Sequence, residues 1–258
     1  YSTASYKNKD LSGIDFSEND FSGNDSLRWD LSGCDLSNIN FTNTNLERTL
    51  VTGSIIRGAN FEGVLGFNSG NLYNTKSWKI KDLYGVKFTG LNMSAWDLSG
   101  QNLQNAGFVN ATLVGTDFTN ADLRGANLNN IKGSQNIKNT IWNDGIIKNF
   151  AMESSDDNFS IRKYEPISVG GASISAKLNT SSSISGGAIL TLEKGAEFEV
   201  VNNSTLTLSK YSEIVINTDL NSSTKFVIEE GSSFNFKDGA KLVINLEDLN
   251  GRNSIRRR

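Results

Sequence analysis

The chain has 258 residues, of which 37% are hydrophobic, so it is long enough for one or two domains with a buried interior. A net charge of -3 gives no overall attraction to nucleic acid or to an anionic membrane surface. The sequence has no histidine and one cysteine, which excludes histidine-based catalysis, histidine-ligated zinc and an intramolecular disulfide. No apolar run approaches the roughly 18 residues of a membrane-spanning helix.

Large apolar residues recur at every fifth position from Leu11 to Phe61, with a single break at Ser26, and again from Leu83 to Leu128. Neither the helical period of 3.6 nor the strand period of 2 produces this spacing, so it indicates a repeat. A second series stands two residues before each apolar residue and includes small residues such as Ala106 and Cys34. Asp or Asn commonly lies between the two.

The strings "TDFTN", "ADLRG" and "ANLNN" resemble the pentapeptide-repeat family, whose pattern is written A(D/N)LXX, over residues 9–131. The resemblance implies an all-β fold: a right-handed quadrilateral β-solenoid with four pentapeptides per coil and coils about 4.8 Å apart. Both the apolar and the small residues would point inward, including Cys34. Trp29 and Trp96 hold the same inward position, so either the solenoid bulges to house an indole, which is favoured, or the indole swings out into a surface patch. The expected structural core is Leu11, Phe16, Phe21, Leu31, Leu36, Phe41, Leu46, Phe61, Leu83, Phe88, Leu98, Leu103, Phe108, Leu113, Phe118, Leu123 and Leu128.

The opening stretch "YSTASYKNKDLSG" returns as "YNTKSWKIKDLYG" at residues 73–85. The repeat predicts two solenoid segments, each with a leading motif: residues 1–62 and 81–132. Between them, residues 63–80 are expected to form a spacer with a short helix capped by Ser69. These stretches resemble an exported, multi-module branch of bacterial pentapeptide-repeat proteins with a β-rich C-terminal region. The resemblance implies a secreted or cell-surface location, and a chain that begins inside a longer array.

Residues 133–250 lose the five-residue spacing and alternate apolar with polar residues, as in "AILTLEKGAEFEV". Apolar pairs recur with a phase of 16, for example Leu190 with Leu206, which predicts two strands per unit. A second, parallel β-solenoid or a stack of antiparallel hairpins fits that spacing, and the strict phase favours the solenoid. The basic ending, residues 251–258, is expected to be a disordered tail.

An acidic series occupies the first segment. Four units per coil would stack Asp10 on Asp30 and Asp15 on Asp35, which makes these four residues weak candidates for a Ca²⁺ ladder. Residues 10–46 carry seven acids against one base, a surface that could mimic a DNA duplex and bind DNA gyrase. The alternative is turn chemistry, in which the short side chain bonds nearby backbone. Turn chemistry is favoured, because residues 81–130 have a net charge of only -1.

Passive glycan binding is another alternative, since aromatic side chains offer stacking faces at Tyr73, Trp78, Trp96 and Trp142. The adjacent carboxylates Asp156 and Asp157 do not form a ready acid/base pair, because neighbours on a strand face opposite sides. We therefore predict a non-catalytic, exported structural or interaction protein without a cofactor. Its partner would be a protein or a cell-surface glycan, and self-association end to end would use the unpaired edges of terminal coils. No nucleic acid or membrane span is expected.

Overall fold

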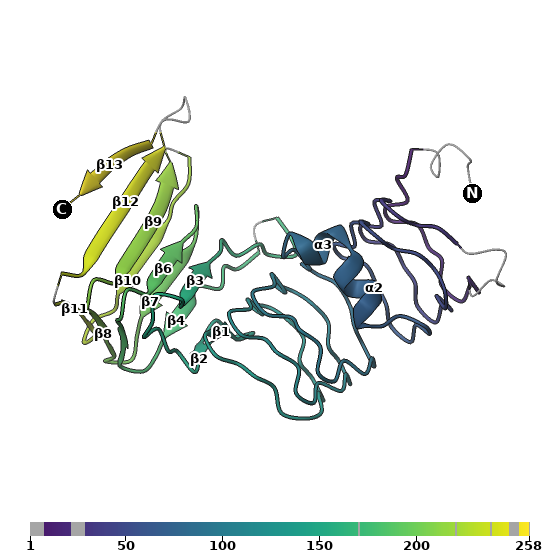
Figure 1. Cartoon of the computed structure of the whole chain (residues 1–258), viewed down its shortest axis with the longest axis horizontal. Helices are drawn as coiled ribbons and strands as arrows, with labels where there is room; N and C mark the ends of the chain where they lie inside the picture. The colour runs from purple at the N-terminus through teal and green to yellow at the C-terminus, as the bar shows by residue number, and fades with distance from the viewer. Residues whose placement is uncertain are drawn as a thin grey trace. The chain divides into compact units, whose positions relative to one another are not determined.

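The computed structural model describes residues 8–21, 29–169, 171–219, 221–237, 239–247 and 253–257. The chain divides into two compact units, Tyr1–Asn136 and Ile137–Arg258, which are taken in turn. The predicted segments at 1–62, 63–80 and 81–132 all fall within the first unit, and their finer boundaries stay predictions. The first unit contains helices α2 (Ser69–Asn74) and α3 (Lys76–Lys79), and the second contains strands β1 to β13 (Figure 1).

The first unit is a stack of coils joined by isolated parallel β-bridges. The amides of most apolar residues in the series donate to a carbonyl of the next coil, as Leu36 does to Ile55 at 2.7 Å. Two residues on, a second amide does the same, as Asn38 does to Arg57 at 2.8 Å. The expected pentapeptide solenoid is confirmed. Its four sides are columns of bridges that begin at Asp10, Asp15, Asp20 and Asp30.

The apolar series lines the interior. Every predicted core residue from Leu11 to Leu123 is at most 5% exposed, while Leu128, in the last coil, is half-buried. Burial of each such side chain stabilises the stack by about 1.5–3 kcal/mol. The second inward series is buried too, with Cys34 at 1% and Ala106 at 0% exposure. Desolvation by burial raises the pKa of the Cys34 thiol, as expected of a structural cysteine.

The coils do not all have the same length. Asn40 bridges Asn60 at an offset of 20 residues, but Asp10 bridges Asp35 and Asp20 bridges Asn45 at an offset of 25. Since Asp30 bridges Leu50 at 20, the five extra residues of the first coil lie between Asp20 and Asp30. Residues 22–28, within that interval, are outside the described part of the chain.

A longer coil carries the two helices. Asn60 bridges Lys87 at an offset of 27, so the two predicted segments stack directly on each other, and the extra residues occupy one side as α2 and α3. The N-cap of α2 is Asn68 rather than the predicted Ser69. Its side chain accepts from the N–H groups of Gly70 and Asn71, and the Asn71 side chain bonds back in a capping box.

The second unit begins with a small antiparallel pair, β1 (Thr140–Ile141) and β2 (Ile147–Lys148). A three-sided parallel β-solenoid follows, which confirms the solenoid over the antiparallel hairpins. The first side is β3 (Asn158–Ile161), β6 (Ile189–Leu192), β9 (Glu213–Asp219), β12 (Lys241–Glu247) and the antiparallel β13 (Asn253–Arg257). The second is β4 (Ala176–Leu178), β7 (Glu197–Val200) and β10 (Lys225–Ile228), and the third is β5 (Ser182–Ile184), β8 (Thr205–Leu208) and β11 (Ser233–Phe236).

Two predictions for this unit are wrong. Leu190 pairs with Ile214, at an offset of 24, and not with Leu206 as a phase of 16 requires. Three strands of eight-residue spacing make one coil, so Leu206 belongs to a different side. The basic ending was expected to be disordered, but Asn253–Arg257 forms β13 against β12. An antiparallel return satisfies the outer backbone groups of β12, which a disordered tail would leave unpaired.

Candidate functional site

The Asp or Asn before each apolar residue is part of the turn. Its side-chain oxygen accepts the backbone N–H two residues further on, at 2.9 Å for Asp15, 3.1 Å for Asn40 and 2.8 Å for Asp117. Hydrogen bonds from the serine two residues on lower the pKa of the carboxyl at Asp10, Asp15 and Asp30. The turn interpretation of this series is confirmed.

The pairs proposed for calcium do not form. The 25-residue first coil places Asp10 beside Asp35, not Asp30, and Asp15 beside Asn40, not Asp35. The Asn40 amide donates to the Asp15 carboxylate at 2.9 Å, where a second carboxylate was expected. In the described ranges, no group of three or more Asp, Glu, Cys or His side chains is placed to hold a metal ion.

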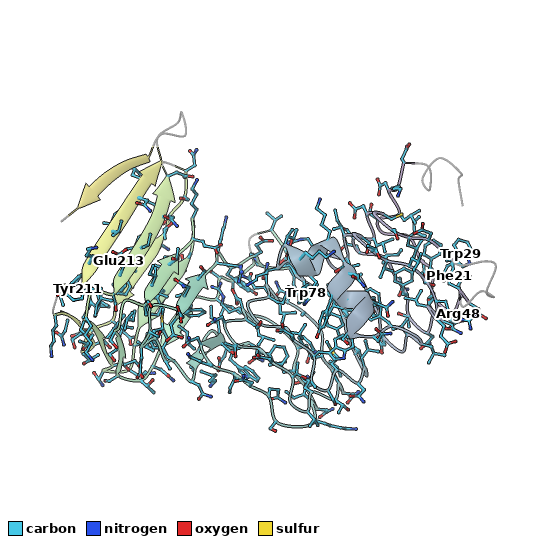
Figure 2. All side chains as sticks on the ribbon, in the orientation of Figure 1. Phe21, Trp29, Arg48, Trp78, Tyr211 and Glu213 are labelled. Carbon is cyan, nitrogen blue, oxygen red and sulfur yellow. The ribbon has the colours of Figure 1, made fainter. Side chains whose placement is uncertain are left out.

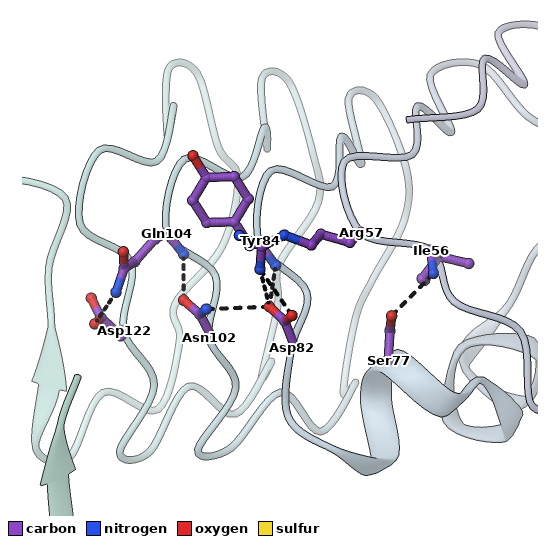
Figure 3. Close-up of polar contacts among 8 residues, drawn as sticks. All are labelled: Ile56, Arg57, Ser77, Asp82, Tyr84, Asn102, Gln104 and Asp122. Carbon is purple, nitrogen blue, oxygen red and sulfur yellow. Dashed lines mark hydrogen bonds and ion pairs between the residues drawn. The ribbon is translucent and has the colours of Figure 1, made fainter. Parts of the chain in front are cut away.

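A ladder of polar side chains follows the side that carries Asp82, Asn102 and Asp122 (Figure 3). Arg57 donates from one guanidinium nitrogen to both oxygens of Asp82, at 2.8 and 2.9 Å, and lies 4.0 Å from the centre of the Tyr84 ring. The Asn102 amide donates to Asp82 at 3.2 Å. This end of the ladder is about one-third exposed, and its charge is neutralised.

The other end of the ladder is buried. Arg124 donates to the two oxygens of Asp122 at 3.0 and 2.6 Å, and Gln104 donates to Asp122 at 2.8 Å. Both members of this ion pair are at most 1% exposed. A buried ion pair needs such additional hydrogen bonds, because the attraction between the two charges alone does not offset the cost of removing both from water. We call Arg57, Asp82, Tyr84, Asn102, Gln104, Asp122 and Arg124 the polar ladder.

The helices of the long coil are anchored by two aromatic side chains. The Tyr73 hydroxyl accepts the backbone N–H of Asp97 at 2.6 Å, and the indole N–H of Trp78 donates to the Asp97 carbonyl at 3.2 Å (Trp78 is labelled in Figure 2). The two rings lie 4.7 Å apart. The polar groups of these aromatics, proposed as glycan platforms, therefore bond the next coil.

The other aromatic candidates are placed differently. Trp96 is 7% exposed and packs near Phe67, as expected of a side chain housed inside the solenoid. Trp29, expected inside as well, is 47% exposed and meets the edge of Phe21 (Figure 2). Phe67 comes from the spacer before α2, and its ring also stacks on that of Phe61. Trp142 is half-buried.

Sequence reasoning missed the polar ladder. Arg57 and Arg124 both stand directly after an inward apolar residue, and their partners stand directly before one. Asp122 is two residues from Arg124, so that pair could have been found from the repeat alone. Arg57 meets Asp82 across 25 residues, because the coil between them is longer than 20 residues.

In the described part of the molecule, the Asp15 carboxylate is bonded to a turn amide, and those of Asp82 and Asp122 are bonded to guanidinium groups. Among the same residues, neither unit has a helix long and apolar enough to cross a membrane. The architecture is that of a β-solenoid repeat protein. Residues 30–65, 82–120 and 92–130 match the family described as Pentapeptide repeats, in eight copies. The first unit is thus built of pentapeptide repeats.

Two solved structures are similar to the chain. One is the pentapeptide repeat protein Rfr23 from the cyanobacterium Cyanothece 51142, with 20% identity, a TM-score of 0.20, and coverage of 54% of this chain and 94% of that one. The other is HetL, a pentapeptide repeat protein involved in heterocyst differentiation regulation from the cyanobacterium Nostoc sp. strain PCC 7120. It has 16% identity, a TM-score of 0.20 and 97% coverage of both chains. Superpositions this weak carry no functional argument. No curated protein sequence matches the chain.

Proposed function

We propose that the chain is a non-catalytic scaffold, secreted or held at a bacterial cell surface, that presents rigid β-solenoid faces to a protein or glycan partner. The observation that carries the proposal is the set of hydrogen bonds that joins coil to coil in the described part of the first unit. The long coil maintains it, since Phe61 donates to Lys87 at 2.9 Å across the junction of the two segments. A stack whose coils are hydrogen-bonded to one another holds its outward side chains in fixed positions.

The charge distribution favours this scaffold over a DNA mimic that binds gyrase. The side that begins with Asp10 and Asp35 continues with the uncharged Ile55. The next two acids along it, Asp82 and Asp122, are paired with arginines. A duplex mimic needs an uninterrupted line of negative charge at the surface. Continued supercoiling by gyrase in excess protein is the result we expect.

Adhesion tests the proposal directly. Beads coated with the chain are expected to bind intact cells of the bacterium that makes it, whereas beads coated with Leu98→Asp, whose coils are expected to unfold, serve as the matched control. Treating the cells with protease or with glycosidases separates a protein partner from a glycan. Fractionation and protease treatment of intact producing cells locate the protein. Equal binding by the two kinds of bead, together with an exclusively cytoplasmic protein, would overturn the proposal.

A further inference from the structure

Among the described residues, the turns that lead into β6, β7, β8, β9, β11 and β12 share one backbone shape. In each, the fourth residue donates its N–H to the carbonyl of the first, as Ser212 does to Ser209 at 3.2 Å. The third residue has a positive φ, a conformation that favours glycine or asparagine. These third residues are Gly187, Gly195, Asn203, Tyr211, Gly231 and Gly239.

Tyr211 is the exception in this set. Its φ is 61°, and a bulky side chain in that region strains the backbone. Glycine, which four of the other turns use, would remove the strain. Burial of the ring does not offset it, because Tyr211 is 75% exposed (Figure 2). Strained residues of this kind gather at binding sites, so the strain and the exposure together indicate that the ring contacts a partner.

The neighbouring coils leave room for the ring of Tyr211. The equivalent turn of the next coil has Gly239, where a Cβ would lie 2.7 and 2.8 Å from two ring carbons of Tyr211. The equivalent turn of the preceding coil has Gly187, whose amide donates to the Lys210 carbonyl at 3.1 Å. Neither glycine has a side chain that could cover the ring. One part of the ring therefore lies against the backbone at Gly239, and the rest faces solvent.

A pair of charged side chains lies beside this turn. Glu213 begins β9, two residues after Tyr211, and its carboxylate accepts from the Lys241 ammonium at 2.8 Å (Tyr211 and Glu213 are labelled in Figure 2). The Glu213 side chain is 28% exposed and that of Lys241 is 60% exposed. A carboxylate next to an ammonium offers both an acceptor and donors to neighbouring hydroxyl groups.

We propose that Tyr211 is a stacking platform for a β-linked chain of glucose or N-acetylglucosamine. Every substituent of these sugar rings is equatorial, so both faces of the ring present C–H groups, which the negative face of an aromatic ring attracts. One face lies on Tyr211, and the hydroxyl groups at the rim bond the Glu213 carboxylate and the Lys241 ammonium. The inference rests on the proposed scaffold function and names one of its partners.

The surroundings of Tyr211 favour a sugar over a protein. An aromatic anchor in a protein interface is surrounded by contacts that exclude water from it. The residues next to Tyr211 along the turn and at the start of β9 are Lys210 and Glu213, both charged. A sugar needs only the free face of the ring and polar groups at its edge.

Saturation-transfer NMR with cellohexaose and with chitohexaose tests the proposal. The unaltered chain is expected to saturate the ring protons of at least one of these sugars. Tyr211→Leu retains a bulky residue at the strained position but removes the aromatic face, and should lower the affinity at least about tenfold. Tyr211→Phe should bind like the unaltered chain. Tyr211→Gly should lose binding without a fall in Tm, because glycine removes the strain.

Asn203→Leu is the matched control, since Asn203 is the third residue of the equivalent turn before β8. It introduces the same side chain in the same backbone conformation in a different turn, and should bind like the unaltered chain. Thermal melts show whether each variant is folded.

Four results would overturn the proposal. Two are the absence of saturation of both sugars and equal binding by Tyr211→Leu and the unaltered chain. A third is a fall in Tm with Tyr211→Gly, which would show that the ring is retained to stabilise the turn. The fourth is loss of binding to intact cells by Tyr211→Leu without any binding of the sugars, which would identify a protein partner. A chain that binds the sugars through Tyr211 but fails the adhesion assay would overturn only the scaffold function.

Discussion

Replacing Leu98 by Asp tests the inward assignment on which the whole solenoid depends. Leu98 is fully buried in the apolar series, and its amide donates to Asp117 in the next coil at 2.8 Å. Truncating a buried leucine costs about 2–5 kcal/mol. Desolvating a carboxylate in its place costs several kcal/mol more. The sum is comparable with the roughly 5–15 kcal/mol that stabilises an entire domain, so the surrounding coils should unfold.

Ser99→Asp is the matched control, since it places the same carboxylate one residue further along, on the outward side. The Ser99 amide donates to Asp97 at 2.9 Å, and the substitution retains that amide. Its cost should be below about 1 kcal/mol. Circular dichroism melts measure both variants, and hydrogen exchange locates the loss of protection, expected in residues 82–136 for Leu98→Asp. Equal destabilisation by the two variants would refute the inward assignment.

Three further predictions concern single contacts. Tyr73→Phe removes an acceptor from a backbone N–H of the next coil and should cost about 1–3 kcal/mol in chemical denaturation. Gly66 and Gly53 both have positive φ, but a Cβ at Gly66 would lie 2.4 Å from a backbone nitrogen whereas one at Gly53 meets nothing, so Gly66→Ala should lower Tm more than Gly53→Ala. The Lys138 ammonium holds the pKa of Asp157 below its usual value, so the Asp157 carboxylate stabilises the fold above about pH 4, and this stabilisation is lost as pH falls through the folded-state pKa. Asp157→Asn should therefore make Tm less dependent on pH in that range.

The five-residue spacing predicted which side chains are buried, but it could not predict which units share a level. Every fifth residue is inward whether a coil has four units or five. The stacking of Asp10 therefore depended on a coil length that the spacing does not contain. The 25-residue first coil moved its neighbour from Asp30 to Asp35. The same limit hid the contact of Arg57 with Asp82, which exists only because the coil between them carries two helices.

The second unit shows the same limit with another period. Its strands recur every eight residues, so a phase of 16 fits the pattern as well as a phase of 24. Closure of the coil decides between them, and closure depends on how many sides fit around the buried core. Three sides place Ile214, and not Leu206, on Leu190. Alternation within each strand was predictable, because it follows from the pleat alone.

The motif repeated at residues 1–13 and 73–85 acquires a physical role from its second copy. A coil of regular length would satisfy the N–H and C=O of Asp97 with backbone groups, but the helices occupy that side. Tyr73 and Trp78 supply an acceptor and a donor instead, so the bonding between coils continues across the insertion. An apolar residue at either position would leave one of those groups of Asp97 without that partner. The first copy also carries aromatic residues with a polar group five residues apart, Tyr1 and Tyr6, although residues 1–7 lie outside the described part of the chain. The Trp–Asp dipeptide likewise occurs twice, at Trp29 and at Trp96, so both parts of the contact are duplicated in the sequence.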